Sequence, residues 1–522
     1  MIRAGPSPRA DVKVPKTSQF WALLRLLAPS AVSLAIVGFT ETFAAGFASY
    51  GERPCIEFEG RWHTGDEVTG YAAAVDAALR EAGVDAHAPI GLVVRNRLWH
   101  AATIAGSLAG GRWLSMIYSF QSPEAVARDV EQVRPAAVVA DEEDWTQPVI
   151  DAATRCGIGG VALSPSGPRV MTVGTPAPAS PSAGLSILTS GTTGPPKRQS
   201  IGEAVLERTV FSVTGGLFAS PDDPPELSYW PFGGIGVCQL IAGFATGKRI
   251  VLLERFSVDD WVRAVRTHRI PRAGVQPAVV RMLLDADVPA GDLASLQFLI
   301  SASGPLDPAT RLEFEQHFGI PIRLAYGATE FAGSVCAWTP EMVERFGDAK
   351  RDSVGRPLPD TQVRIVDPDT GDKAPTGQRG VLEARIAALS PDWIRTTDIA
   401  SIDADGFVTL HGRADGAIIR GGFKILPETV RQVLLTHPGV RDACVVGVPD
   451  DRLGQVPFAA VEPARGQPVP ESDELREWVR AALPVHHVPV AVAVVDDLPR
   501  TPSLKVRLPD VAALYEAVRV NG

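Results

Sequence analysis

The chain has 522 residues, of which 45% are hydrophobic and 21% charged, a composition typical of soluble enzymes and a length that predicts two to four structural units. Its formal net charge of −10 is spread along the chain, which argues against a nucleic-acid partner. The five cysteines are scattered without a CxxC pair, which argues against a disulfide framework or a zinc site and favours the reducing cytoplasm.

The N-terminal region is not expected to cross a membrane. Residues 1–15 are rich in Pro, Arg and Lys and predict a disordered tail. Residues 21–39 are apolar and nearly long enough to span a bilayer, but Arg25 and Pro29 interrupt them and no signal-peptide cleavage pattern follows. We therefore expect a buried helix here and no stable membrane insertion.

From about residue 66 to 330, short apolar stretches alternate with helical patterns. Ser122 and Pro123 begin a predicted helix that ends at Pro135. Strands are predicted at residues 90–94, 136–140, 249–253 and 296–301, and an exposed connector at 164–183. Strands that alternate with helices imply parallel sheets covered on both faces, which predicts an α/β fold of layered sheets.

The character of the sequence changes after Gly355. Strands predicted at residues 363–366, 380–386 and 406–410 are joined by turns, as in a small β unit. Beyond these, an α+β tail is predicted, with helices at 427–436 and 473–483 and strands at 444–448, 458–461 and 490–495. We therefore divide the chain into a tail (1–15), an N-terminal core (16–411) and a mobile C-terminal domain (412–522).

A loop rich in hydroxyl groups and glycine, LTSGTTGPPK, spans residues 188–197. Its candidate phosphate-binding positions are Thr189, Ser190, Gly191, Thr192, Thr193, Gly194 and Lys197. The glycines let backbone N–H groups turn inward, the hydroxyls add donors, and the lysine adds a positive charge. No Gly-Lys-Ser/Thr ends the loop, so it is not a Walker A sequence.

Five further blocks follow in order. They are Ala325–Glu330 (AYGATE), Trp393–Asp398 (WIRTTD), Gly412–Asp415 (GRAD), Gly421–Glu428 (GGFKILPE) and Leu498–Lys505 (LPRTPSLK). With the phosphate loop, their order and separation resemble the adenylate-forming (ANL) superfamily of acyl-CoA synthetases, luciferases and nonribosomal adenylation domains. The resemblance covers about residues 40 to 510.

The resemblance implies a two-step ligase that uses ATP and Mg²⁺. A carboxylate attacks the α-phosphate of ATP to give an acyl-adenylate and pyrophosphate, and an acceptor then takes the acyl group and releases AMP. The family pattern assigns the β- and γ-phosphates to the loop with Lys197, the α-phosphate to Thr329, and Mg²⁺, the metal, to Glu330.

The same resemblance assigns the nucleoside and the C-terminal residues. Adenine would contact Tyr326 and the segment Ser303, Gly304 and Pro305. Asp398 would accept hydrogen bonds from both ribose hydroxyls, and Arg413 would assist at the ribose or phosphate. Lys505 would bridge carboxylate and phosphate during adenylation. Asp415 matches the hinge about which the small domain rotates, to present either Lys505 or the segment at 421–424.

The acyl pocket is expected to be lined by Phe232, Gly233, Gly234, Gly236, Ala302 and Gly327. Gly234 aligns with a position where the family usually has a histidine or an aromatic residue. Two interpretations stay open. The glycines either widen the pocket for a rigid aromatic acid, monocyclic or polycyclic, or form a turn that closes against the backbone.

Two departures from the family pattern concern the acceptor. Leu504 and Thr397 stand where glycine is usual, and the stretch 387–393 is short. We expect CoA to be the acceptor. The alternative is an amide bond synthetase, in which an amine attacks the adenylate directly, and the acidic pair Asp222 and Asp223 could attract its ammonium group.

Two other functions are less favoured. A carrier-loading domain is disfavoured because no carrier protein follows the C-terminus, and a nucleotide binder without turnover is disfavoured because Lys197, Glu330, Asp398 and Lys505 are all present. The sequence identifies neither the acid nor the oligomeric state.

Overall fold

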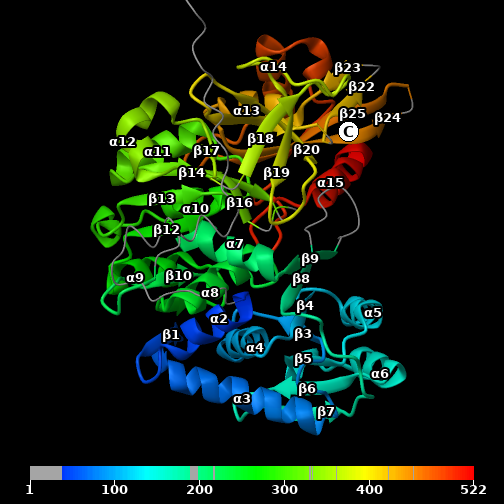
Figure 1. Ribbon diagram of the computed structural model, residues 1–522. Helices are drawn as coiled ribbons and strands as arrows, with labels where there is room; N and C mark the ends of the chain where they lie inside the picture. Colours follow the sequence, from blue (N-terminus) through cyan, green and yellow to red (C-terminus); the bar gives the residue numbers. More distant parts are fainter. Residues whose placement is uncertain are drawn as a thin grey trace, which may run out of the picture. The chain divides into compact units, whose positions relative to one another are not determined.

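The computed structural model describes residues 38–188, 198–214, 218–328, 331, 333–359, 361–414, 416–420, 423–450 and 452–521. The chain from Phe39 onward forms one compact unit in which layers of sheet and helix alternate (Figure 1). The predicted tail and nearly all of the apolar segment at 21–39 lie outside the described residues. No described helix is both long and apolar enough to reach across a lipid bilayer.

The first sheet has seven strands in the order β7-β6-β5-β3-β4-β8-β9. These are β3 (Ile90–Val94), β4 (Trp113–Tyr118), β5 (Ala137–Asp141), β6 (Gly159–Leu163), β7 (Arg169–Thr172), β8 (Gly184–Leu188) and β9 (Arg198–Gly202). The five central strands are parallel and the two edge strands are antiparallel to them. The short edge strand β7 lies within the predicted connector. It was not predicted because its residues are exposed or half-buried and show no apolar pattern.

Side-chain alternation explains why helices cover both faces of this sheet. Leu92 and Val139 belong to one core cluster and their neighbours Val93 and Val138 to another. The first cluster is covered by α3 (Gly65–Glu81) and α4 (Leu98–Ala109), the second by α5 (Pro123–Val133) and α6 (Gln147–Cys156) (Figure 1). The Ser122 side chain caps α5 as predicted.

Two smaller sheets follow, one with the order β10-β11-β1-β2 and one with three parallel strands in the order β12-β13-β14. Their strands are β1 (Pro54–Phe58), β2 (Arg61–Thr64), β10 (Glu226–Ser228), β11 (Ile250–Leu252), β12 (Arg272–Val275), β13 (Phe298–Ser301) and β14 (Ile322–Leu324). The helices of this region are α2 (Phe39–Ala48), α7 (Glu203–Thr214), α8 (Ile235–Thr246), α9 (Val258–His268), α10 (Pro277–Asp285) and α11 (Pro308–Phe318). The expected α/β class is thereby confirmed.

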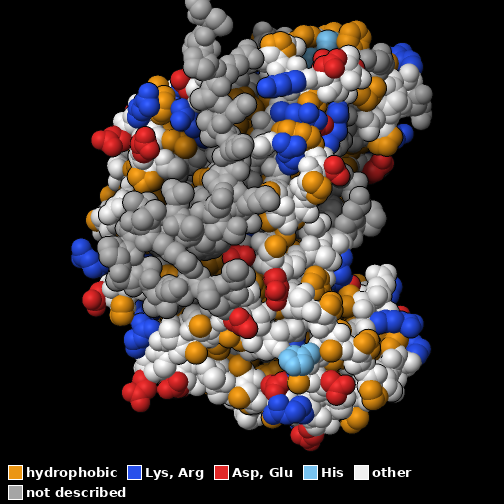
Figure 2. Space-filling model, in the orientation of Figure 1, with side chains coloured by type: hydrophobic (Ala, Val, Ile, Leu, Met, Phe, Trp, Pro, Cys, Tyr) orange, Lys and Arg blue, Asp and Glu red, His pale blue; other side chains and the backbone are white. Residues whose placement is uncertain are grey.

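The β unit expected after Gly355 is present. It contains a four-stranded antiparallel sheet of β18 (Thr361–Val366), β19 (Gly380–Ile386), β20 (Ile394–Ile402) and β21 (Val408–Arg413). Just before it lie β15 (Tyr326–Ala328), β16 (Gly333–Ala337), α12 (Pro340–Phe346) and β17 (Arg356–Pro357). Lys and Arg side chains gather over this region on the face seen in Figure 2. Within the sheet and its connecting loop, Arg364 and Arg385 both lie over the Trp393 ring.

The C-terminal part of the chain, residues 416–521, is built on a five-stranded sheet. Its elements are β22 (Ile418–Arg420), β23 (Phe423–Ile425), α13 (Pro427–Leu435), β24 (Val440–Asp450), β25 (Gly454–Pro463), α14 (Ser472–Ala482), β26 (Val492–Val494) and α15 (Leu508–Asn521). Helices α13 and α14 cover one face and α15 covers the other. The predicted helices and strands of this tail are confirmed, whereas the boundary after residue 411 stays a prediction.

A buried ionic cluster stabilises this C-terminal part. The carboxylate of Asp442 accepts hydrogen bonds from Arg431 (3.0 Å) and Arg500 (2.7 Å), and Arg431 also pairs with Glu428 (3.0 Å). Burial alone would raise the pKa of Asp442, but the charges of Arg431, Arg281 and Arg500 outweigh it and lower this pKa to about 2. The ionised carboxylate therefore contributes to folding at neutral pH.

We predict that Asp442→Asn lowers the free energy of unfolding by about 2 kcal/mol at pH 7, and by roughly half as much at pH 3. The folded-state pKa of Asp442 is lowered, so its contribution is complete above the ordinary value of 3.8 and is lost as the pH falls through about 2. Urea unfolding at several pH values measures this difference. The exposed Asp473 is the control, and Asp473→Asn should change little; an Asp442→Asn deficit independent of pH would contradict the assignment.

Candidate active site

Three parallel strands end side by side at one edge of the β12-β13-β14 sheet. Val275 pairs with Ser301, and Ser301 with Leu324. Beyond the strand ends, the N–H of Ala302 donates to the carbonyl of Val275 (3.2 Å) and that of Ala325 to the carbonyl of Ser301 (3.0 Å). Ligands of open parallel sheets bind at the carboxyl ends of the strands, so this edge is the candidate site.

The segment predicted to line the adenine lies at the end of β13. Ser303 adopts a left-handed conformation with φ 71°, and Gly304 and Pro305 are exposed. A Cβ atom added at Gly304 would come no closer than 3.7 Å to another group, the Pro277 ring. The segment is therefore accessible to a ligand.

Tyr326, Asp398 and Arg413 lie together on three strands. The Tyr326 hydroxyl donates a hydrogen bond to the Asp398 carboxylate, and Asp398 is in register with Arg413 across β20 and β21. Burial raises the pKa of Tyr326, and the charge of Asp398 raises it further, so the phenol keeps its proton and remains a donor. The structure thus brings together three residues that the sequence assigned to the nucleotide.

Asn96 holds the segment that was assigned to the acyl pocket. It follows β3 and is 4% exposed; its Nδ2 donates to the carbonyl of Trp230 (2.9 Å) and its Oδ1 accepts from the N–H of Phe232 (2.9 Å). The amide fixes the backbone of this segment with both of its polar atoms. Phe232 itself is 1% exposed and its ring belongs to the core. Sequence reasoning missed Asn96, although two polar residues, Arg95 and Asn96, just after a buried strand were a usable signal.

The glycines of this segment differ in what surrounds them. A Cβ atom at Gly233 would lie 2.2 Å from the Tyr118 ring, and one at Gly236 would lie 1.8 Å from the carbonyl oxygen of Trp230. At Gly234 the nearest atom would be 3.9 Å away. Gly233 and Gly236 therefore allow close packing, and Gly234 alone of the three leaves open space.

Gly327 permits a close approach of two strands. A Cβ atom there would lie 2.4 Å from the carbonyl oxygen of Gly333, and the pairing of β15 with β16 shifts register between Tyr326 and Gly327. Arg208 on α7 is 6% exposed and supports the same region, because it donates to the carbonyl of Ser334 (2.9 Å) and to Thr361 (3.1 Å). Nothing in the sequence distinguished this arginine from others on helices.

Lys505 lies in a tight loop of the C-terminal part. Arg500 and Val506 pair across the loop, and the N–H of Thr501 donates to the carbonyl of Lys505 (2.7 Å). The N–H of Leu504 donates to the carbonyl of Thr501 (2.8 Å), and Leu504 has φ 61°. Leucine therefore occupies a left-handed position that ordinarily favours glycine.

Several assigned residues lie outside the described part of the chain: Thr189–Lys197, Thr329, Glu330 and the hinge Asp415. Among the described residues, no group of three or more His, Cys, Asp or Glu side chains is arranged to hold a metal ion. The assignments of phosphate, Mg²⁺ and hinge therefore stay predictions.

Comparison with known proteins assigns the family. The family model "AMP-binding enzyme" matches residues 43–390, and the model "AMP-binding enzyme C-terminal domain" matches residues 429–505. The first of these matches covers well over half of the chain.

Named relatives and a solved structure agree with this match. The chain is 29% identical to 4-coumarate–CoA ligase-like 9 of Oryza sativa subsp. japonica over 493 residues, which cover 86% of each chain. It is 31% identical to 2-succinylbenzoate–CoA ligase of Bacillus pumilus over 61% of this chain and 66% of that protein. The structure of the amide bond synthetase McbA from Marinactinospora thermotolerans is similar, with 25% identity, a TM-score of 0.74, and coverage of 91% of this chain and 100% of that one.

The ordered motifs, the strand-end site and the matched family models agree. The chain belongs to the AMP-binding enzyme family of the adenylate-forming superfamily and is an ATP-dependent adenylate-forming ligase.

Proposed function

We propose that the protein activates a small-molecule carboxylic acid, with a bulky aromatic group, as its acyl-adenylate and transfers the acyl group to CoA. The main observation in support is that Tyr326 is hydrogen-bonded to Asp398, which pairs in register with Arg413. Tyr326 follows the parallel strand β14 closely in the chain. The three residues supply a ring, a carboxylate and a guanidinium, which suit a base, ribose hydroxyls and a phosphate respectively.

In the first step, a carboxylate oxygen bonds to the α-phosphorus of ATP as the bond to pyrophosphate breaks. Both reactants are anions, so fixed cations and donors must offset their repulsion. We assign Lys505 to the position between carboxylate and α-phosphate, Thr329 to the α-phosphate, and the loop with Lys197 to the departing pyrophosphate. Mg²⁺ held by Glu330 would neutralise part of the phosphate charge.

Asp398 is assigned to the ribose. A carboxylate accepts several hydrogen bonds at once, and the bond from the Tyr326 hydroxyl fixes its orientation. The N–H of Asp398 is itself held by the Thr396 hydroxyl (3.0 Å), so backbone and side chain are both positioned before the nucleotide binds. Such preorganisation lowers the entropy lost on binding.

The open space at Gly234 supports an acid with a bulky ring. Asn96 fixes the neighbouring backbone, so the space is bounded by a rigid segment. Two relatives of the chain are named for aromatic acids, 4-coumarate and 2-succinylbenzoate. Both observations favour an aryl acid over a short aliphatic one.

In the second step, the acceptor attacks the acyl carbonyl carbon and AMP leaves with one oxygen of the original acid. CoA is the proposed acceptor, because the named ligases above use it. An amine is the second candidate, which the likeness to an amide bond synthetase and the departures at Thr397 and Leu504 favour. The proposed rotation of residues 412–522 about Asp415 would separate the two steps.

The first test is ATP–pyrophosphate exchange with a panel of aryl and fatty acids. Lys505→Ala should slow exchange about 100-fold or more, since removing a group that stabilises transition-state charge typically costs this much. Lys373 is exposed, and Lys373→Ala is the matched control. Absence of exchange with every acid, or unchanged exchange in Lys505→Ala, would refute the proposal.

A second experiment identifies the acceptor. With an acid that supports exchange, the purified protein is supplied with CoA, with an amine, or with both, and the products are separated by mass. We expect the acyl thioester to form fastest. Amide without thioester would replace CoA with an amine as the acceptor and leave adenylation unaffected.

The pocket assignment predicts a change in acid preference. Gly234→Leu should lower kcat/KM for a bulky aryl acid about tenfold relative to a small acid, because its side chain enters the open space without meeting the backbone. Gly291 is exposed, and a Cβ atom there would meet nothing within 4 Å, so Gly291→Leu is the control. An unchanged ratio of kcat/KM for the bulky acid to that for the small acid would show that Gly234 does not line the acyl pocket.

A further inference from the structure

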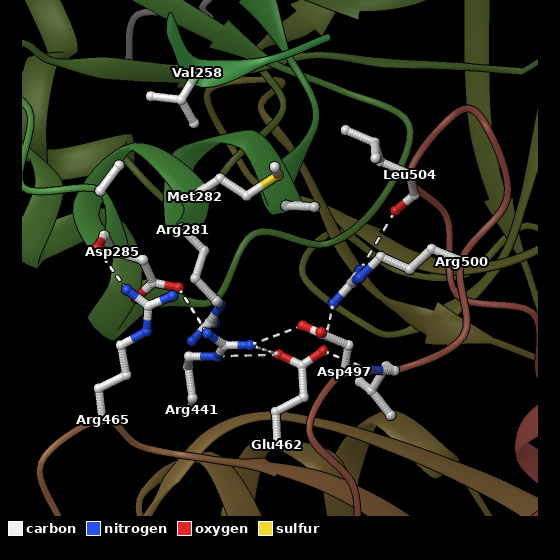
Figure 3. Close-up of a pocket in the computed structure, with 13 residues that line it drawn as sticks. Val258, Arg281, Met282, Asp285, Arg441, Glu462, Arg465, Asp497, Arg500 and Leu504 are labelled. Atoms are coloured by element: carbon white, nitrogen blue, oxygen red, sulfur yellow. Dashed lines mark hydrogen bonds and ion pairs between the residues drawn. The ribbon is translucent and has the colours of Figure 1, made fainter. Parts of the chain in front are cut away.

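A cavity of about 410 Å³ lies where the C-terminal part meets α10 (Figure 3). One wall comes from α9 and α10, with Val258, Arg281, Met282 and Asp285. The opposite wall is formed by Arg441, Glu462, Arg465, Asp497, Arg500 and Leu504. The residue beside Lys505 thus lines a contact between the two parts of the chain.

Leu504 makes the apolar half of this contact. Its side chain packs against the core cluster that contains Val279 and Leu283 of α10, and it shares the cavity with Met282. A φ of 61° strains the backbone of leucine, whereas glycine would adopt this conformation without strain. The side chain offsets this strain by covering apolar surface of α10.

Arg441 makes the ionic half. It pairs with Asp285 at the end of α10 (2.9 Å), and Arg465 donates to the Asp285 carbonyl (2.8 Å). The side chains of Arg441 and Asp285 are only 16% and 23% exposed, so solvent screens the pair less than an ordinary surface ion pair. A cation at the end of a helix also interacts favourably with the helix dipole.

Glu462 connects the ionic half to the Lys505 loop. This carboxylate is 2% exposed and accepts from Arg441 (2.9 Å), from Arg500 (3.3 Å) and from the N–H of Leu498 (2.7 Å). Arg500 then donates to the carbonyl of Leu504 (3.4 Å). The contact at Asp285 is therefore coupled to the backbone that carries Lys505.

We propose that Leu504, Arg441 and Asp285 form a docking contact that holds the C-terminal part in the orientation used for adenylation. The three are positioning residues that act through Lys505. This inference rests on the proposed function, since it assigns the docked orientation to the first half-reaction. Breaking the contact should reduce the docked population, slow adenylation, and leave acyl transfer unimpaired.

The ionic half is tested with Asp285→Ala. ATP–pyrophosphate exchange should slow about fivefold with little change in KM for ATP, a factor typical of coupling between two conformations. Transfer from preformed acyl-adenylate to the acceptor should be unchanged or faster. Asp285→Glu should restore most of the exchange, and Glu313→Ala, at an exposed position of α11, is the control. Equal losses in both half-reactions, or no loss in exchange, would overturn the proposal.

The apolar half is tested with Leu504→Gly beside Leu504→Ala. Glycine relieves the left-handed backbone but removes the side chain, whereas alanine removes the contact and keeps the strain. If docking by the side chain matters, both variants slow exchange several-fold. Exchange as fast as in the parent protein for Leu504→Gly would show that only backbone geometry matters, and would refute the role of the side chain.

A distance measurement tests the contact without relying on activity. Spin labels at Gln316→Cys on α11 and Glu477→Cys on α14 are introduced into a Cys156→Ser background, because the other four cysteines are buried. The distance distribution should be narrow in the parent and broader in Asp285→Ala and Leu504→Gly. Identical distance distributions in the parent and the variants would overturn the docking contact. If the distributions differ but the parent shows no ATP–pyrophosphate exchange, only the proposed function is refuted.

Discussion

The position of Lys505 depends on one buried carboxylate, that of Glu462. A carboxylate that is 2% exposed is costly to bury unless it is fully hydrogen-bonded, and here two guanidinium groups and one backbone N–H supply the bonds. One of these guanidinium groups, Arg441, also reaches Asp285 of α10. Through Arg441, Arg500 and the N–H of Leu498, the Glu462 carboxylate therefore links the sheet of the C-terminal part to the Lys505 loop and to α10.

In the proposed mechanism, the residues that recognise the nucleotide and the residue that takes part in catalysis come from different parts of the chain. Tyr326, Asp398 and Arg413 come from antiparallel strands that are rigidly paired, which suits residues that must hold a nucleoside in one place. Lys505 instead comes from a loop that contacts α10 through Leu504, and the neighbouring Arg441 and Arg465 add an ion pair and a hydrogen bond to Asp285. A contact of this size can be broken and remade during turnover, as alternation between two half-reactions requires.

Much of the fold could be predicted from the sequence because hydrophobic patterns are local. Residues 90–94 and 380–386 form strands with the predicted bounds, since the first is an apolar run and the second is rich in apolar residues and follows a turn. Strand β20 was missed because its first half, with Thr396 and Asp398, is polar. The surroundings of the glycines assigned to the pocket could not be read locally either. The Trp230 carbonyl leaves no room for a side chain at Gly236, whereas Gly234 has no close neighbours, and both facts depend on the folded backbone. The position of Asn96 after a strand was a local signal, but its partners Trp230 and Phe232 are distant in the sequence and could not be read from it.

The proposed reaction requires that a carboxylate oxygen of the acid attacks the α-phosphorus of ATP. The most direct measurement uses an acid labelled with ¹⁸O in both carboxylate positions, followed by mass analysis of the released nucleotide after complete turnover. Because the acyl–oxygen bond breaks in the second step, the released AMP should carry one ¹⁸O atom and the pyrophosphate should be unlabelled. Unlabelled AMP, or release of ADP with labelled phosphate, would contradict the proposed reaction.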